Sequence, residues 1–283
     1  MPELPEVEIL VRHLAPLLRG KTVRRVDVRR AKVIAPTTER ALSRILRGAK
    51  FIGVERRGKY LLFTLRVPRR RNPVLLVGHL GMTGRIYLLP KENPLPRHAA
   101  VVMELGRHLF VYEDTRYFGR LTLDTSGPCR LGPEPLGREF SVDYFADTLQ
   151  RSAQSIKVKL LDQTLVAGIG NIYASEALFR ARISPKLPAR RLAQKQIQHL
   201  WEAIREVLKE AIDCGSTLPL DFSGTRRRDG LFYYGAAGDE SKFYQERLRV
   251  YDRGGEPCVR CRTTIRRVVQ AARSTYYCPH CQR

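Results

Sequence analysis

The chain has 283 residues, which is enough for one large domain or two compact domains with buried cores. Its 51 Lys and Arg against 28 Asp and Glu give a formal charge of +23 and a sequence pI near 10.3. This excess favours a polyanionic partner: DNA, RNA or an anionic membrane surface. The sequence has no apolar run long enough to cross a membrane and no basic signal-peptide start, so we expect a cytoplasmic protein that binds nucleic acid.

The first residues, Pro2-Glu-Leu-Pro-Glu-Val-Glu8, combine a terminal proline with three acids. Once Met1 is removed, Pro2 carries a secondary amine. Terminal amines have a pKa of about 7.7–8.0, against about 10.4 for lysine, so more of the amine is unprotonated and nucleophilic. Its attack on a sugar C1′ or an aldehyde gives an iminium that drives elimination. The carboxylates of Glu3, Glu6 and Glu8 repel one another's negative charge, which favours one of them staying protonated so that it can act as an acid. The alternative is that the stretch merely starts a helix.

A helix and a series of strands are predicted next. Residues Pro5–Leu18 have one apolar face and end at Gly20, which predicts a helix whose docking fixes the terminal amine. Short, regularly spaced β-rich runs follow, typical of an antiparallel sandwich. The predicted strands are Thr22–Val28, Lys50–Glu55, Tyr60–Val67, Val74–Val77, Arg85–Leu89, Ala99–Leu105, His108–Tyr112 and Gly119–Leu123.

The second half of the chain changes character. Residues 126–137 are rich in glycine and proline and indicate a linker. From Val142 to about Asp213 the pattern is helical, and residues 215–248 form a predicted long loop. The fold class is therefore α+β. The predicted domains are a β-sandwich at 1–126, a linker at 127–141, a helical domain with the long loop at 142–248, and a cysteine module at 249–283.

Turn residues of the predicted sandwich are candidates for a DNA site. Lys59 lies at a turn between two strands, where composition alone predicts an exposed hairpin lysine. Met82 lies in a turn between two glycines; methionine usually fills a core, but such a turn can push it into the DNA stack. Arg116 and Phe118 in a second turn offer a matching wedge, which a base-flipping enzyme needs to fill the hole. The alternative for Phe118 is a core position.

The run Gly168-Ile-Gly-Asn171 opens a predicted helix that ends near Ala181. Asn171 is a good N-cap residue, and free N–H groups at a helix start also bind phosphate; the two interpretations are compatible. Two basic runs, Arg69–Arg71 and Arg226–Arg228, fit either DNA contact or a solvated face, and the sequence leaves both interpretations open.

Four of the six cysteines form the pattern Cys258-x2-Cys261-x16-Cys278-x2-Cys281. In a cytosolic chain this spacing predicts a zinc site rather than disulfides. Four protein ligands leave no open position, so we expect one structural Zn²⁺. Between the two pairs, Thr263–Val269 and Ser274–Tyr277 predict a hairpin with Arg273 at its tip. Cys129 and Cys214 are expected to be reduced, buried and inert.

These motifs together resemble a bacterial formamidopyrimidine-DNA glycosylase, from the family of bifunctional glycosylase/AP lyases that also includes endonuclease VIII. The resemblance runs nearly end to end and rests on Pro2–Glu8, on Gly168-Ile-Gly-Asn-Ile-Tyr-Ala-Ser-Glu176 and on the four cysteines. It implies a base-excision repair enzyme that removes formamidopyrimidines and 8-oxoguanine through a proline iminium and β,δ-elimination. Leu4 favours this branch, because the endonuclease VIII type usually has glycine there.

The resemblance also implies a fold and residue roles. The fold would be a β-sandwich with an N-terminal helix, then a helix–two-turn–helix domain with a four-cysteine zinc-finger hairpin. Pro2 and Glu3 would carry the catalysis, with Lys59 and Arg273 assisting the eliminations. The residues implied in DNA contact are Met82, His98, Arg116, Phe118, Lys157 and Asn171. Lys157 is a better match to the family's phosphate-binding lysine than Lys159, and Arg266 and Arg267 fit surface charges. The implied partner is double-stranded DNA with oxidised bases or abasic sites, bound by a monomer in the bacterial cytoplasm at the nucleoid.

Two features depart from the family pattern. Relatives often carry two histidines near His98, one on a phosphate, whereas Ala99 and Ala100 follow here. The 215–248 loop is longer than expected and contains Arg226–Arg228 and Phe232–Tyr234, and it bears on the lesion preference more than on the chemistry. Two alternatives therefore stay open: an oxidised-pyrimidine glycosylase of the endonuclease VIII type, and a non-catalytic zinc protein that binds damaged DNA.

Overall fold

The computed structural model describes residues 2–215 and 247–283, which divide into two compact units. The first unit contains Pro2 and Glu6–Cys129. The second contains Glu3–Pro5 together with the described residues from Arg130 onward. The predicted features at Arg226–Arg228 and Phe232–Tyr234 lie outside the described residues. None of the helices in the described ranges is long and apolar enough to cross a membrane.

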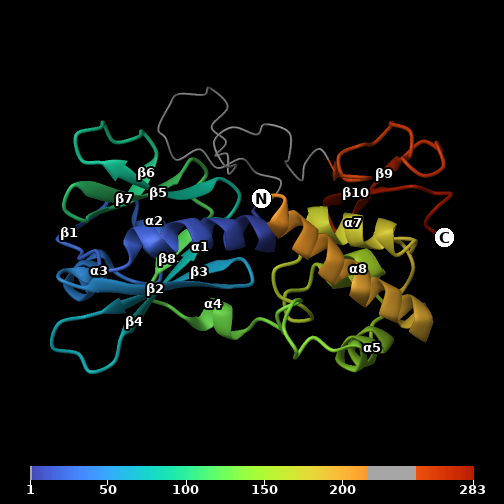
Figure 1. The fold of residues 1–283 in the computed structure, drawn as a ribbon, viewed down its shortest axis with the longest axis horizontal. Helices are drawn as coiled ribbons and strands as arrows, with labels where there is room; N and C mark the ends of the chain where they lie inside the picture. Colours follow the sequence, from blue (N-terminus) through green and yellow to red (C-terminus); the bar gives the residue numbers. More distant parts are fainter. Residues whose placement is uncertain (1, 216–246) are drawn as a thin grey trace. The chain divides into compact units, whose positions relative to one another are not determined.

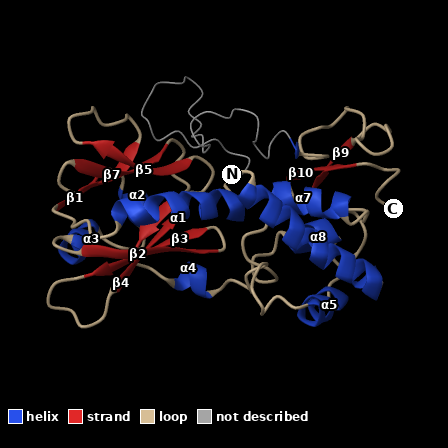
Figure 2. Cartoon of the chain, in the orientation of Figure 1, coloured by secondary structure: helices blue, strands red, loops and turns tan. Residues whose placement is uncertain are grey.

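The first unit is a sandwich of two antiparallel four-stranded sheets (Figures 1 and 2). One sheet has the order β2-β3-β4-β8, formed by Lys50–Arg57, Tyr60–Arg66, Val74–His79 and Arg120–Thr122. The other has the order β1-β6-β7-β5, formed by Arg25–Val28, Ala99–Glu104, His108–Asp114 and Gly84–Pro90. The predicted sandwich is confirmed, and every predicted strand is present with its ends shifted by a few residues.

The alternating pattern of the strands builds the core of this unit. On β3, Leu61, Phe63 and Leu65 are fully buried while the residues between them are partly exposed. Phe63 packs against Phe51 and Phe110 with ring centroids 6.1 and 5.5 Å apart, which joins the two sheets. Aromatic pairs at such separations add stability beyond the area that they bury.

Three helices accompany the sandwich. Helix α1 (Leu4–Leu18) is confirmed and is followed by Gly20 at φ +82°. Helices α2 (Ala31–Ile34) and α3 (Glu39–Leu46) were not predicted. In α3 the buried residues Leu42 and Leu46 are four positions apart and the Thr38 side chain caps the helix start, so the signals of a short helix were present in the sequence.

The second unit is mainly helical and ends in a hairpin (Figure 2). Its helices are α5 (Val142–Gln150), α6 (Ile156–Leu160), α7 (Asn171–Arg180) and α8 (Gln194–Asp213), with a 3-10 turn η1 (Ala189–Arg191). The hairpin consists of β9 (Arg266–Gln270) and β10 (Arg273–Tyr277). The apolar face of α8 is buried, and Trp201 Nε1 anchors the helix by donating to the Phe140 carbonyl at 2.7 Å. Helices and hairpin agree with the predicted pattern.

The two cysteines outside the zinc pattern depart from expectation. Both are free thiols, but the expectation of burial is wrong: Cys129 is exposed and Cys214 is half-buried. Cys129 ends the short helix α4 (Ser126–Cys129), in which Pro128 is the buried residue. The sequence around Cys129 does not indicate an apolar partner that would bury its side chain.

Candidate active site

The Glu3 carboxylate lies at the N-terminus of α7. Oε1 accepts a hydrogen bond from the Ile172 N–H at 2.9 Å, Oε2 accepts one from the Tyr173 N–H at 3.4 Å, and Glu3 is 1% exposed. The first N–H groups of a helix have no partner within the helix, and the helix dipole stabilises a negative charge there. Glu3 is thereby held in one orientation, one peptide bond from Pro2.

Two glycines make this close approach possible. A Cβ on Gly170 would overlap the carboxyl carbon and Oε1 of Glu3. A Cβ on Gly168, whose φ is +86°, would lie 2.7 Å from the Leu4 side chain. The Leu4 N–H also donates to the Gly168 carbonyl at 3.1 Å. The Gly-x-Gly run therefore leaves the space that Glu3 and Leu4 occupy.

The interpretation of Asn171 as an N-cap is wrong. The N-cap of α7 is Gly170, and Asn171 is the first helical residue. Two N–H groups at the start of α7, those of Ile172 and Tyr173, donate to the Glu3 carboxylate. The Asn171 side chain instead joins two other elements. Its Oδ1 accepts from Lys157 Nζ at 2.9 Å, and its Nδ2 donates to the Ser274 carbonyl at 2.8 Å, next to Arg273.

Lys157 is fully buried and carries a perturbed amine. Its Nζ donates to Asn171 Oδ1 and to Ser175 Oγ, both at 2.9 Å. Burial lowers the pKa of Lys157 to about 8; the negative charge of Glu3 opposes the shift and the positive charge of Arg273 adds to it. The structure thus brings Lys157 and Asn171 together. Ser175 was not predicted, although its spacing of four residues from Asn171 on one helix face was a usable signal.

Lys59 lies in the turn between β2 and β3 and is only 7% exposed, so the interpretation as an exposed hairpin lysine is wrong. The strand register pairs Tyr60 with His79, and their ring centroids are 4.8 Å apart. Burial first, then the charges of Lys59 and Arg120, lower the pKa of His79 to about 4. Its Nδ1 accepts from the Gly81 N–H at 3.1 Å, which leaves the ring proton on Nε2. Sequence analysis did not single out this neutral histidine.

Met82, Arg116 and Phe118 come together as the wedge interpretation requires. Met82 is 46% exposed and Phe118 is 51% exposed, so neither is a core residue. Arg116 Nη1 lies 3.4 Å from Met82 Sδ, and the guanidinium carbon lies 4.9 Å from the centroid of the Phe118 ring. One cation therefore contacts both apolar side chains.

A single buried carboxylate, that of Asp114, ties the two wedge turns together. Its Oδ1 accepts from Thr83 Oγ1 at 2.6 Å and from the Arg116 N–H at 3.1 Å, and its Oδ2 accepts from the Gly119 N–H at 2.9 Å. Thr83 follows Met82 and Gly119 follows Phe118, so one side chain sets the geometry of both turns. Asp114 was not predicted, although an aspartate that ends a strand before a glycine-containing turn is a recognisable signal.

His98 lies beside the same aspartate. Its carbonyl accepts from the Asp114 N–H at 3.1 Å, and the histidine is half-buried. The backbone of His98 therefore lies next to the turn that carries Arg116.

Two arginines hold the Glu8 carboxylate. Glu8 accepts from Arg12 Nε and from Arg56 Nε, each at 2.8 Å. Burial raises the pKa of Glu8, but the hydrogen bonds and charges of Arg56 and Arg12 outweigh burial and lower it overall. Glu8 is thus excluded as the expected proton-holding acid.

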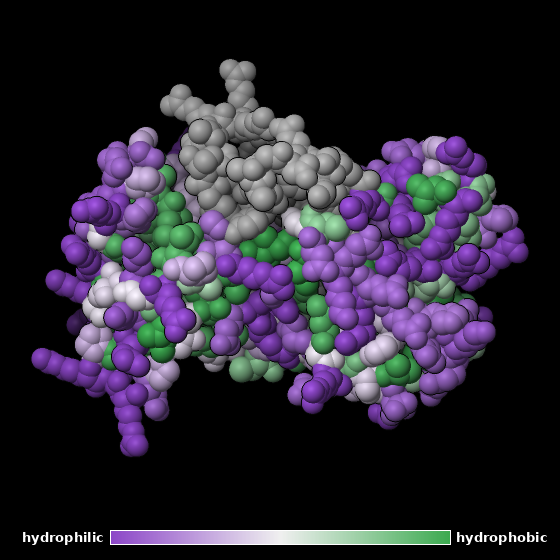
Figure 3. Space-filling model, viewed as in Figure 1, coloured by the Kyte–Doolittle hydropathy of each residue, from purple (hydrophilic) through white to green (hydrophobic). Residues whose placement is uncertain are grey.

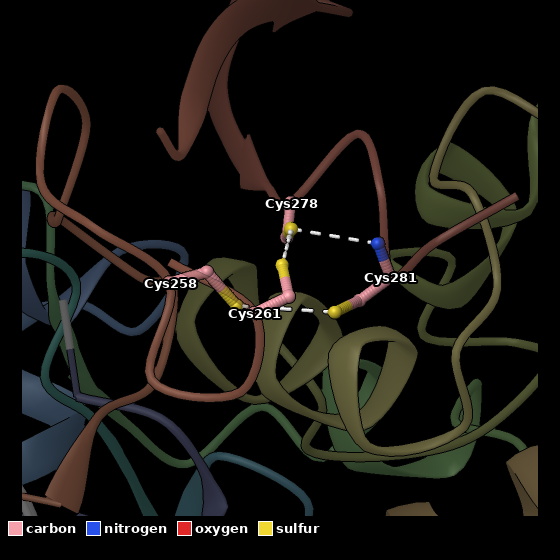
Figure 4. A group of neighbouring side chains, drawn as sticks. All are labelled: Cys258, Cys261, Cys278 and Cys281. Carbon is pink, nitrogen blue, oxygen red and sulfur yellow. Dashed lines mark hydrogen bonds between the residues drawn. The ribbon is translucent and has the colours of Figure 1, made fainter. Parts of the chain in front are cut away.

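The four cysteines of the predicted zinc site face one point (Figure 4). All four Sγ atoms lie within 4.8 Å of one another; the Cys258–Cys281 and Cys261–Cys278 Sγ separations are 3.9 and 3.5 Å. A tetrahedral ion with Zn–S bonds of about 2.3 Å has S–S separations of about 3.8 Å. The donor set therefore fits one zinc ion with no ligand position left open.

Arg273 is an exposed residue that begins β10, directly after the hairpin tip. The tip residues Ala271 and Ala272 have φ values of +46° and +59°. Arg266 and Arg267 on β9 are exposed, as expected for surface charges. On α6, Lys159 pairs with Asp162 at 2.8 Å, unlike Lys157.

Relieving the backbone strain at the hairpin tip should stabilise the zinc module. Left-handed backbone costs about 1–2 kcal/mol for each L-residue, and two-residue turns of this kind prefer Asn-Gly. We expect the double variant Ala271→Asn/Ala272→Gly to lose zinc to a chelator about fivefold more slowly, which corresponds to about 1 kcal/mol. A zinc-release assay with a colorimetric chelator measures this. Faster release from the variant would contradict the strain argument.

Comparison with known proteins places these features in one family. The formamidopyrimidine-DNA glycosylase N-terminal domain matches residues 1–121, the H2TH domain of the same enzymes matches 131–221, and the zinc finger found in FPG and IleRS matches 255–283. The formamidopyrimidine-DNA glycosylase of Carboxydothermus hydrogenoformans is 39% identical over 283 residues, covering all of both chains. The chain belongs to the formamidopyrimidine-DNA glycosylase family.

Solved structures of formamidopyrimidine-DNA glycosylases share this fold. A Lactococcus lactis FPG mutant in complex with a Fapy-dG-containing DNA is 32% identical, with a TM-score of 0.87 and 100% of both chains covered. MutM in complex with carbocyclic 8-oxo-G-containing DNA is 32% identical, with a TM-score of 0.85 and the same coverage. The family resemblance, the fold class and the single structural zinc site are confirmed. Neither the endonuclease VIII type nor a non-catalytic zinc protein is favoured by these relatives.

Proposed function

We propose that this chain removes oxidised purines, namely formamidopyrimidines and 8-oxoguanine, from double-stranded DNA and then cleaves the strand at the abasic site. The family membership and the DNA bound by its structural relatives support this function. The observation that carries the proposal is the buried Glu3 carboxylate, which α7 fixes directly beside Pro2 in the chain. The chain would act as a monomer on nucleoid DNA in the bacterial cytoplasm.

The proposed reaction begins at the Pro2 nitrogen. The nitrogen forms a bond to C1′ while the bond from C1′ to the damaged base breaks and the base leaves with the electron pair. Glu3, whose negative charge two N–H groups stabilise, takes a proton from the attacking amine and delivers it to O4′ as the sugar ring opens. The resulting iminium acidifies C2′, so loss of a C2′ proton expels the 3′ phosphate. A second elimination expels the 5′ phosphate, with Lys59 and Arg273 assisting the two eliminations.

The DNA-contacting residues are proposed in two groups. Met82, Arg116 and Phe118 would fill the space left by the flipped nucleotide, because they form one exposed cluster. Lys157 and Asn171 would hold a backbone phosphate, with Arg273 on the neighbouring hairpin. His98 would contact DNA near the Arg116 turn.

Borohydride trapping tests the proposal directly. Protein from which Met1 has been removed is incubated with duplex DNA containing 8-oxoguanine, and the reductant converts the iminium into a stable adduct. We expect a covalent adduct that maps to Pro2 and is absent with undamaged DNA and in Pro2→Gly. An adduct with an abasic site alone would keep the lyase and redirect the search to another base, whereas no adduct with either DNA would support the binding-protein alternative.

The proline mechanism makes a form that retains Met1 a decisive control. Its Pro2 nitrogen is an amide without a nucleophilic lone pair, so we expect neither an adduct nor strand cleavage. Full lyase activity from protein shown by mass spectrometry to keep Met1 would exclude the mechanism.

DNA binding should weaken as the pH rises through about 8, because Lys157 then loses its charge. A bound phosphate raises the pKa of the amine, so affinity should fall by up to about tenfold per pH unit above the pKa of the free protein. Fluorescence anisotropy with a lesion-containing duplex from pH 6.5 to 9.5 measures this. Lys157→Met should bind weakly and lose that slope, whereas Lys159→Met, altered on the same helix, should keep it. An equal slope in Lys157→Met would remove Lys157 from the phosphate site.

A further inference from the structure

The two ends of the sheet formed by β2, β3 and β4 carry different functional residues. Strand β3 begins at Tyr60, which pairs with Arg57 on β2 and with His79 on β4. Lys59 and the turn of Met82 therefore lie at this end of the sheet. The other end of β3 is Arg66, which pairs with Lys50. At about 3.3 Å per residue, β3 separates these two ends by about 20 Å.

Nine basic residues collect at the end of the sheet away from Lys59, a group named here the distal basic surface. They come from segments 19–21, 44–50 and 66–72, which contain no Asp or Glu. Their members are Arg19, Lys21, Arg44, Arg47, Lys50, Arg66, Arg69, Arg70 and Arg71. Nine of these 17 residues are therefore basic, against 51 of 283 in the whole chain.

Backbone contacts hold the three segments side by side. The Gly20 N–H donates to the Phe51 carbonyl at 2.8 Å, which brings the end of α1 to the start of β2. Lys50 is paired with Arg66 in the sheet, and a Cβ on Gly48 would lie 3.4 Å from Pro68 in the β3–β4 loop. The charges therefore form one surface although they are separated in the sequence.

The distal basic surface is open to solvent and lacks counter-charges. Apart from the half-buried Lys21, its residues are exposed, and none takes part in an ion pair with any residue in 2–215 or 247–283. In Figure 3, long hydrophilic side chains project at the end of the first unit where Figure 1 shows the connection into β4. Like charges gathered without acids repel one another, and a polyanion relieves this repulsion.

We propose that the distal basic surface binds the phosphate backbone of a second DNA duplex while a first duplex occupies the residues near Lys59 and Met82. Arginine is the side chain best suited to bidentate phosphate contact, and it supplies most of this surface. The three segments contain no Phe, Tyr or Trp. Single-stranded nucleic acid is bound by stacking on aromatic side chains, so their absence from these segments favours a duplex. Binding two duplexes at once lets the protein pass between DNA segments without dissociating.

A two-duplex capture assay tests this inference. Bead-bound duplex carrying a tetrahydrofuran abasic-site analogue is saturated with protein, washed, and offered a labelled undamaged duplex. We expect Arg69→Gln/Arg70→Gln/Arg71→Gln to reduce capture of the labelled duplex at least fivefold. The plot of log affinity against log salt for undamaged duplex should also become shallower by about 0.9 for each phosphate that the variant no longer neutralises. Single-turnover excision from a short lesion duplex should stay within twofold of the unsubstituted protein.

A variant with the same loss of charge elsewhere controls for net charge. Arg190→Gln/Arg191→Gln/Lys195→Gln alters three exposed residues of the second unit and should capture the labelled duplex normally. Equal loss of capture in both variants, or unchanged capture in the first, would overturn the inference. If the Arg69–Arg71 variant also lost excision from the short duplex, these arginines would belong to the lesion-binding surface instead. If the distal basic surface captured single-stranded RNA in preference to duplex DNA, RNA would be the partner.

Discussion

Replacing Gly170 with alanine should slow base excision by at least about a hundredfold while the chain stays folded. The added Cβ would overlap the Glu3 carboxyl carbon and Oε1, so Glu3 must leave the N-terminus of α7. A correctly placed acid–base group contributes about a hundredfold to ten-thousandfold to a rate, and we expect a loss in that range. Single-turnover excision of 8-oxoguanine from a duplex measures it, with circular dichroism and zinc content as checks on folding.

A double-variant comparison separates this effect from general damage to the protein. Because Gly170→Ala acts through Glu3, Gly170→Ala/Glu3→Gln should be no slower than Glu3→Gln alone. Gly53→Ala is the matched control, since a Cβ there meets only Thr64 at ordinary contact distance and should leave excision unchanged. Additive losses in the double variant would show that residue 170 acts on something other than Glu3.

Replacing Asp114 with asparagine should impair excision from duplex DNA far more than cleavage of an already unpaired abasic site. An amide cannot accept all three hydrogen bonds, so one buried donor at Thr83, Arg116 or Gly119 loses its partner. Such a loss costs about 1–3 kcal/mol, and we expect excision from a duplex to slow by about fivefold to a hundredfold. The wedge is needed only where a base must be extruded, so the rate on a single-stranded abasic site should stay within twofold.

Two substitutions at Thr83 test the same mechanism. Thr83→Ser keeps the hydroxyl that donates to Asp114 and should behave like the unsubstituted protein. Thr83→Val removes it and should slow duplex excision less than Asp114→Asn, because the two backbone donors remain paired. Equal slowing on duplex and single-stranded substrates in Asp114→Asn would indicate a general loss of stability rather than a displaced wedge.

Much of the fold follows from local sequence patterns. The strands alternate in hydrophobicity, α8 has a clear apolar face, and the four cysteines have zinc spacing, so each could be predicted without knowledge of its neighbours. The turns that hold Met82 and Arg116 were also recognisable, because glycines mark them. Short α3 was missed although Thr38 is a favourable N-cap and Leu42 and Leu46 have the spacing of one helix face.

Several features of the candidate site that the sequence did not reveal depend on contacts between residues far apart in the chain. Asn171 has every local property of an N-cap, yet Gly170 takes that position because Glu3 needs the space above it. Lys59 looks like a solvent-exposed turn residue until β4 places His79 beside it. Asp114 gains its importance only when the turns holding Thr83 and Gly119 meet. A local pattern carries no information about such partners.

The pairing of Glu3 with α7 spans 169 positions of the chain and so bears on the order of events during synthesis. Chains emerge from the ribosome amino terminus first, and domains fold as they emerge. Until Ile172 and Tyr173 have been made, Glu3 has no helix N-terminus to bind, so α7 does not yet hold the start of the chain. Under the proposed mechanism the Pro2 amine would be exposed before Glu3 is fixed, and the nascent chain would stay inert towards DNA until well over half of it exists.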